Sequence, residues 1–172
     1  MKHQFMGFSL VELIVTLSIS AILTTFSLPY FEVIIEQSRS ESSIRSIQQL
    51  IQLARNHAIT FGTRVTVCPL VNSQCNWDWQ SGFSVFTDGG KRNELGSEDE
   101  LLYVMGPFNS NDIVYYNRNA IRFQPDGLAS GTNGTFRYCP NTYNSPYSKA
   151  VIINQSGRIR FSRQKNIECQ QD

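Results

Sequence analysis

The chain has 172 residues, 41% of them hydrophobic, and a formal net charge of +1. This length allows one ordinary domain plus one further element, and the apolar fraction excludes a wholly disordered chain. The net charge alone points to no class of partner, although basic residues gather toward the C-terminus.

The N-terminus combines a short polar segment with a long apolar one. Met1–Gly7 reads MKHQFMG, and the following Phe8–Phe31 contains Glu12 as its single charged residue. About 20 helical residues, at about 1.5 Å each, cross a bilayer. We therefore expect residues 8–30 to form a membrane-spanning helix. Lys2 precedes the span, which predicts a cytoplasmic N-terminus and a periplasmic or extracellular remainder.

The position of the small-residue junction distinguishes this segment from an ordinary secretory signal, which is cleaved after its apolar stretch. No small-residue cleavage motif follows Phe31. The one small-residue junction, Gly7–Phe8, precedes the apolar run. Cleavage there removes residues 1–7 as a leader and leaves the whole helix on the mature protein.

The stretch Gly7–Leu13 (GFSLVEL) resembles the type III leader junction of type IV pilins and pseudopilins. The resemblance implies cleavage after Gly7 by a prepilin peptidase and N-methylation of Phe8. It places Glu12 at the fifth mature position, where the family has its glutamate, and Pro29 where pilins commonly have a helix-kinking proline. It also implies a single-pass protein of the bacterial inner membrane, with a periplasmic head, that later joins a pilus or pseudopilus.

A carboxylate near one end of an apolar helix has a clear energetic consequence. Unless Glu12 is paired, its insertion costs about 2–3 kcal/mol. In a filament, it can pair with the α-amino group of Phe8 on a neighbouring subunit, which makes it an assembly residue. The alternative is a glutamate that snorkels to the lipid headgroups.

The helix is expected to continue, as an amphipathic half over residues 31–61. Its apolar positions follow the three- and four-residue spacing of one helical face: Ile44, Ile47, Ile51, Ala54 and Ala58. Gly62 is a stop signal. Pro29 removes one backbone hydrogen bond and is expected to bend or locally melt the helix.

Residues 62–172 are expected to form a β-rich head. Short runs rich in β-branched and aromatic residues predict eight strands: Arg64–Pro69, Gly82–Thr87, Leu101–Met105, Ile113–Tyr116, Ala120–Phe123, Thr135–Cys139, Ala150–Ile153 and Arg158–Phe161. Turn signals such as Asp88-Gly89-Gly90 and Pro125-Asp126-Gly127 separate them. Because such turns favour hairpins, we expect mostly antiparallel pairing and an α+β fold.

Several motifs in the head resemble the GspH/FimT family of minor pilins and pseudopilins. They are ARNHAITFGTRVT from Ala54, Cys68-Pro69, Trp79–Asp88, Phe123–Gly127, Thr135–Cys139 and Ser156–Arg160. They occur in the family's order along nearly the whole chain. The resemblance implies a type IV pilin-like fold, in which two antiparallel sheets pack on the C-terminal half of the long helix.

The four cysteines are Cys68, Cys75, Cys139 and Cys169. An even number outside the N-terminal segment suits disulfides in an oxidising compartment. Cys68 with Cys75 closes a small loop and is the favoured pair, which leaves Cys139 with Cys169. The alternative is a zinc site, although its paired ligands usually have two to four residues between them and here there are six.

The C-terminal region is basic and supplies the candidate DNA-binding residues: Lys149, Arg158, Arg160, Arg163 and Lys165. On a strand, Arg158 and Arg160 point to one face, which suits phosphate contacts. Gly157–Arg160 (GRIR) resembles the basic segment of family members that look like double-stranded DNA receptors for natural transformation. One alternative is a charged edge strand that blocks aggregation. Another is a pseudopilin of a type II secretion system with no DNA binding.

The remaining features point to no chemistry. The acidic stretch Asp88–Asp112 lacks the spacing of a calcium loop and is expected to be a solvated hairpin loop. Trp77 and Trp79 are expected to lie partly in the core, and His57 to be a packed or surface residue. We expect no enzyme, catalytic residue, cofactor or metal. The expected partners are other pilin subunits, the prepilin peptidase, the inner membrane and double-stranded DNA.

Overall fold

A computed structural model of the chain describes residues 9–129 and 131–169, without the side chains of residues 26–30. The chain divides into two compact units, Met1–Glu36 and Gln37–Asp172. The first contains the N-terminal part of helix α1 (Leu10–Phe61), and the second contains the rest of α1 and every strand. The core residues lie between Ile44 and Cys169, so the second unit, here called the head, contains the complete described core.

Helix α1 ends where the sequence predicts, at Phe61. Gly62 follows with a φ of 62°, in the left-handed region that favours glycine. The Thr63 N–H donates to the carbonyl of Ala58 at 3.2 Å, which closes the last turn as in a Schellman motif. The expected apolar stripe is confirmed, because its five residues are all at most 1% exposed: Ile44, Ile47, Ile51, Ala54 and Ala58.

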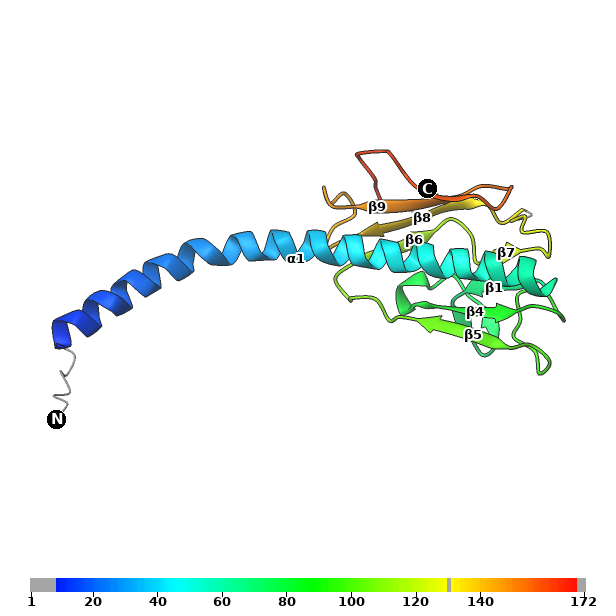
Figure 1. Cartoon of the computed structure of the whole chain (residues 1–172), viewed down its shortest axis with the longest axis horizontal. Coiled ribbons are helices and arrows are strands. Elements are labelled where there is room, and N and C mark those ends of the chain that lie inside the picture. Colours follow the sequence, from blue (N-terminus) through cyan, green and yellow to red (C-terminus); the bar gives the residue numbers. More distant parts are fainter. Residues whose placement is uncertain (1–8, 130, 170–172) are drawn as a thin grey trace, which may run out of the picture. The chain divides into compact units, whose positions relative to one another are not determined.

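Two four-stranded antiparallel sheets share the core with α1, as expected for the pilin-like α+β fold. The first has the order β5-β4-β1-β7, built from Leu101–Met105, Phe83–Thr87, Val65–Cys68 and Ile121–Phe123. The second has the order β10-β9-β8-β6, built from Ile159–Phe161, Lys149–Ile153, Gly134–Cys139 and Ile113–Tyr116. Within the head, α1 runs across both sheets, with β9, β8 and β6 on one side and β1, β4 and β5 on the other (Figure 1).

The eight predicted strands all occur, with boundaries that differ by at most one residue, but a short hairpin was missed. It pairs β2 (Leu70–Val71) with β3 (Gln74–Cys75) through Asn72 and Ser73, which both have positive φ values. The sequence pattern of this hairpin is weak, because two residues are too few to show the alternation of a strand. The Cys68–Cys75 disulfide closes this hairpin.

Aromatic side chains fill the space between the sheets and the helix. The short 3-10 helix η1 (Trp79–Ser81) places Trp79 in the core, where its ring meets Tyr116 and Phe136 edge-on at 5.4 and 5.2 Å between centroids. The Trp79 indole N–H donates to the carbonyl of Arg118 at 2.9 Å. Trp77 is 62% exposed, so only one of the two tryptophans is a core residue.

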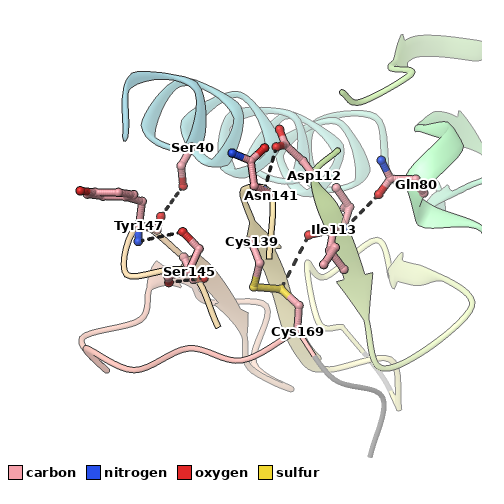
Figure 2. The surroundings of a disulfide bond; sticks show 11 residues. Ser40, Gln80, Asp112, Ile113, Cys139, Asn141, Ser145, Tyr147 and Cys169 are labelled. Atoms are coloured by element: carbon pink, nitrogen blue, oxygen red, sulfur yellow. Dashed lines mark hydrogen bonds between the residues drawn. A yellow bond between two sulfur atoms is a disulfide. The ribbon is translucent and has the colours of Figure 1, made fainter. Parts of the chain in front are cut away.

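Both disulfides are the pairs that the sequence favoured, Cys68–Cys75 and Cys139–Cys169. They use all four cysteines, so no cysteine is left to bind zinc and the zinc alternative is wrong. In Figure 2 the second bond joins the end of β8 to the C-terminal segment, beside Ile113 on β6. Ile167 and Cys169 form a second small apolar cluster there with Cys139 and Ala150, so the segment is anchored to the outer side of the sheet.

Candidate functional site

The C-terminal basic residues lie along and beyond an edge strand. Strand β10 pairs only with β9, at the edge of the second sheet. Four of the five candidate residues are exposed, namely Arg158, Arg160, Arg163 and Lys165. None of these four takes part in the ion pairs found among residues 9–129 and 131–169. Their charge is therefore available to a partner.

Lys149, the fifth candidate, differs from the other four. It begins β9, and its Nζ lies 3.6 Å from a carboxylate oxygen of Glu41 on α1. Its side chain is 43% exposed. The charge of this lysine is therefore shared with Glu41.

The strand begins one residue later than the sequence suggests, at Ile159. Arg158 therefore precedes the strand, and the alternation of side chains between the two faces of β10 determines the direction of Arg160 only. The expectation that both arginines point to one face of a strand does not hold for Arg158. Ile159 is partly buried against the core, and the guanidinium of Arg45 on α1 lies 5.7 Å from the ring centroid of Phe161. Ile159 and Phe161 thus pack β10 beside the helix. Because successive side chains of a strand point to opposite faces, Arg160 lies on the other face of β10.

Gly157 has a packing role in positioning Arg158. Its φ is 74°, and a Cβ at this position would lie only 1.9 Å from the carbonyl oxygen of Gly127. That oxygen accepts a hydrogen bond from Nε of Arg55 on α1 at 3.2 Å. The turns at Gly127 and Gly157 therefore approach each other closely, and Arg55 joins them to the helix. This approach requires glycine at the position directly before Arg158.

The N-terminal half of α1 exposes many apolar side chains, together with Glu12 and Glu32. Among the side chains that the structure describes between Leu10 and Ile35, which exclude residues 26–30, thirteen large hydrophobic ones are at least 43% exposed. The hydroxyls of Thr16, Ser18 and Ser20 donate to helix carbonyls three or four residues earlier, at 2.7–2.9 Å. Each of these hydroxyls is satisfied within its own helix.

Several assembly predictions lie at the limit of the described structure. Gly7 and Phe8 fall outside the described residues, and so does the side chain of Pro29, although the helix assignment continues through it. Glu12 is exposed and has no ion pair within the described part of the chain. Across the residues described, no helix has a stretch that is both long and apolar enough to cross a membrane.

The sequence suggested that the acidic stretch Asp88–Asp112 is a solvated loop. The structure differs, because the residues at its two ends, Asp88 and Asp112, are buried. Asp88 accepts hydrogen bonds from Thr66 at 2.6 Å and from the N–H of Asn93 at 3.2 Å. It also lies 3.4 Å from Nε of Arg122, whose pKa is lowered chiefly by burial. This cluster supports the turn after β4.

Asp112, at the other end, is the centre of a second polar cluster. Arg39 on α1 donates to both of its carboxylate oxygens, at 2.7 and 2.8 Å, and this contact raises the pKa of Arg39. The Tyr138 hydroxyl and the Asn141 N–H also donate to it. Burial, followed by the hydrogen bond to Asp112, raises the pKa of Tyr138 to about 12. Figure 2 shows Asp112 and Asn141 beside the Cys139–Cys169 bond.

No sequence signal identified these clusters, since Arg39 and Asp112 are 73 residues apart in the chain. His57 lies against Phe61, with 4.4 Å between ring centroids, as a packed residue of the helix. Among the residues described, no three His, Cys, Asp or Glu side chains are grouped to hold a metal ion.

In a comparison with known protein families, residues 43–157 match the family model described as type II transport protein GspH. The chain belongs to this GspH family. Its members are pilin-like structural proteins, and the match spans the head from the buried stripe of α1 to Gly157. No curated protein matches the chain.

The GspH fold assignment also agrees with solved structures. One crystal structure of the Pseudomonas aeruginosa type IV minor pilin FimU matches with a TM-score of 0.62 at 20% identity, covering 78% of this chain and 98% of FimU. A second crystal form of FimU matches with a TM-score of 0.58 at 19% identity, covering 76% and 99%. At this identity the likeness concerns the fold.

Proposed function

We propose that this GspH-family protein is a minor pilin that joins a type IV pilus and contacts DNA through its basic C-terminal segment during natural transformation. The observation that carries the DNA contact is the row of exposed basic residues at the β10 edge, Arg158, Arg160, Arg163 and Lys165, without carboxylate partners among the described residues. Such a row suits a phosphate backbone, which is contacted mainly through charge.

The proposed assembly follows the pilin leader motif. A prepilin peptidase cleaves after Gly7, Phe8 is methylated, and the apolar half of α1 anchors the subunit in the inner membrane with its head in the periplasm. In the filament, Glu12 pairs with the α-amino group of a neighbouring Phe8. The exposed apolar residues of this half and its internally bonded hydroxyls support burial in an apolar environment.

The DNA contact is tested with the full chain in a neutral detergent and a labelled DNA duplex. Binding should weaken as salt rises, because each phosphate contact releases counterions. The Arg158→Gln, Arg160→Gln double variant should bind more weakly, with a slope of log K against log salt that is shallower by about 2.

A matched control changes the same net charge elsewhere. Lys91→Gln, Arg92→Gln alters the loop between β4 and β5, on the other sheet, and should leave DNA affinity nearly unchanged. Wild-type chain that binds no duplex at low salt, or two double variants that lose affinity equally, would refute the contact through the β10 edge.

A second candidate function is a pseudopilin of a type II secretion system. It is favoured by the description of the matching family model as a type II transport protein. The same helix chemistry serves both assemblies. In this case the protein is required for export of secreted enzymes and its basic segment binds no DNA, so a secretion assay of the deletion strain separates the two candidates.

A further inference from the structure

We infer that the cleft between α1 and the turn before β10 is a phosphate-binding subsite that extends the DNA contact from the sheet edge onto the helix. This inference rests on the proposed DNA contact. The cleft has a volume of about 320 Å³ and is lined by Gln52, Arg55, Asn56, Arg158 and Ile159. Its ligand is one phosphodiester group of the DNA backbone.

The lining of this cleft is selective for an anion. It contains two guanidinium groups, two side-chain amides and no carboxylate. A larger cleft of about 480 Å³, under the C-terminal segment, contains Arg137 but also Glu168. The acidic residue of the neighbouring turn, Asp126, is not part of the lining and accepts a hydrogen bond from the Leu128 N–H at 3.0 Å.

Arg55 is held in position before any ligand arrives. Its Nε donates to the carbonyl of Gly127 at 3.2 Å, which fixes the plane of the guanidinium against the two turns. No hydrogen bond of its Nη atoms is found within the described residues. A guanidinium fixed in this way can present its remaining N–H donors to a phosphate with little further loss of side-chain entropy.

Arg158 comes to the same cleft from the other side. It is exposed and follows Gly157, whose turn packs on Gly127. The two arginines are thus brought together by one packing contact, and both line the cleft between α1 and the turn before β10. Two guanidinium groups can bind one phosphate both through opposite charge and through paired N–H donors that match the phosphate oxygens.

The test places a negative charge in the cleft without touching Arg55. Gln52→Glu changes an exposed helix residue of the lining, and Gln49→Glu makes the same change one turn earlier, outside the lining. With the full chain in neutral detergent and a labelled duplex, Gln52→Glu should weaken binding several-fold and make the salt slope shallower by about 1. Gln49→Glu should behave like the wild type.

Asn56→Asp, at a second exposed position of the lining, should repeat the effect of Gln52→Glu, and the melting temperatures of all three variants should stay within a few degrees of the wild type. If Gln52→Glu and Asn56→Asp keep wild-type affinity and slope while Arg160→Gln, Arg163→Gln loses binding, the subsite is wrong and the proposed function stands. If the wild type binds no duplex, both fail.

A free anion is the other source of a phosphate group. Inorganic phosphate and the duplex are therefore added separately, at constant ionic strength, while the Nε–H resonances of the arginines are followed by NMR. A shift of the Arg55 resonance with the duplex supports the subsite. A shift with inorganic phosphate and none with the duplex identifies a free-anion site and overturns the DNA contact here.

Discussion

At the scale of single residues, buried carboxylates hold the loops of the head to its regular elements. Asp112 joins three segments, because its hydrogen-bond partners are Arg39 on α1, Tyr138 on β8 and the Asn141 N–H beyond β8. Its side chain is fully buried, and that of Arg39 is 25% exposed. Removing one member of such a cluster leaves the others buried without partners, which is costly.

Asp112→Ala should therefore lower the free energy of unfolding of the head by about 3–5 kcal/mol. The exposed pair between Lys91 and Glu94 provides the control, and Lys91→Ala should cost at most about 1 kcal/mol. Denaturant unfolding of residues 37–172 measures both. Similar small losses for the two variants would contradict a structural role for Asp112.

The raised pKa of Tyr138 makes the stability of the head depend on alkaline pH. An unfolded tyrosine releases its proton near pH 10, whereas Tyr138 in the fold keeps it to about pH 12. Between these values the unfolded state binds fewer protons, so stability is fully present below about pH 10 and falls as pH rises toward 12. Burial raises the pKa of Tyr116 as well, which acts in the same direction.

Denaturation midpoints of the head at pH 8, 10 and 11 should therefore decrease above pH 10. Because Tyr138→Phe removes one titrating group, its midpoint should decrease less steeply over the same range. Parallel pH profiles for the wild type and this variant would show that Tyr138 does not carry the effect.

At the scale of elements, periodicity predicted most of the fold because the pattern has a physical cause. The spacing of Ile44, Ile47 and Ile51 places them on one face of α1, and all three are buried. The hairpin β2–β3 was missed, since two-residue strands show no alternation. The buried pair of Arg39 and Asp112 depends on tertiary contacts across the chain, which no local pattern contains.

The candidate site was predictable in part. Sequence indicated the basic residues and offered an edge strand only as an alternative. It did not indicate the start of β10 at Ile159 or the cleft that Arg158 shares with Arg55. Both follow from the turn at Gly157, whose close contact with Gly127 brings together turns that are distant in the chain.

Gly157→Ala tests this contact between turns. A Cβ would meet the Gly127 carbonyl at 1.9 Å, in addition to the strain of a positive φ. Gly62→Ala is the matched control, because Gly62 also has a positive φ but no atom within 4 Å of a Cβ. The control should lose about 1–2 kcal/mol of stability, and Gly157→Ala clearly more, in denaturant unfolding of the head. Equal losses would mean that the contact with Gly127 relaxes without cost.

At the scale of the whole molecule, the two compact units have different surfaces. The unit ending at Glu36 exposes large apolar residues of α1, whereas the head encloses its core between a helix and two sheets. The proposed function uses both, with the apolar helix for assembly and the β10 edge for DNA. The head can therefore stay folded in variants that fail to assemble.

Incorporation of the chain into sheared filaments tests the central claim, that this protein is a pilus subunit, most directly. The wild-type chain should be present in the filament fraction, and Glu12→Ala should be strongly depleted from it while the melting temperature of its head is unchanged. Glu32→Ala, at another exposed glutamate of α1, should incorporate normally. A wild-type chain absent from filaments, or Glu12→Ala present at the wild-type level, would contradict the account.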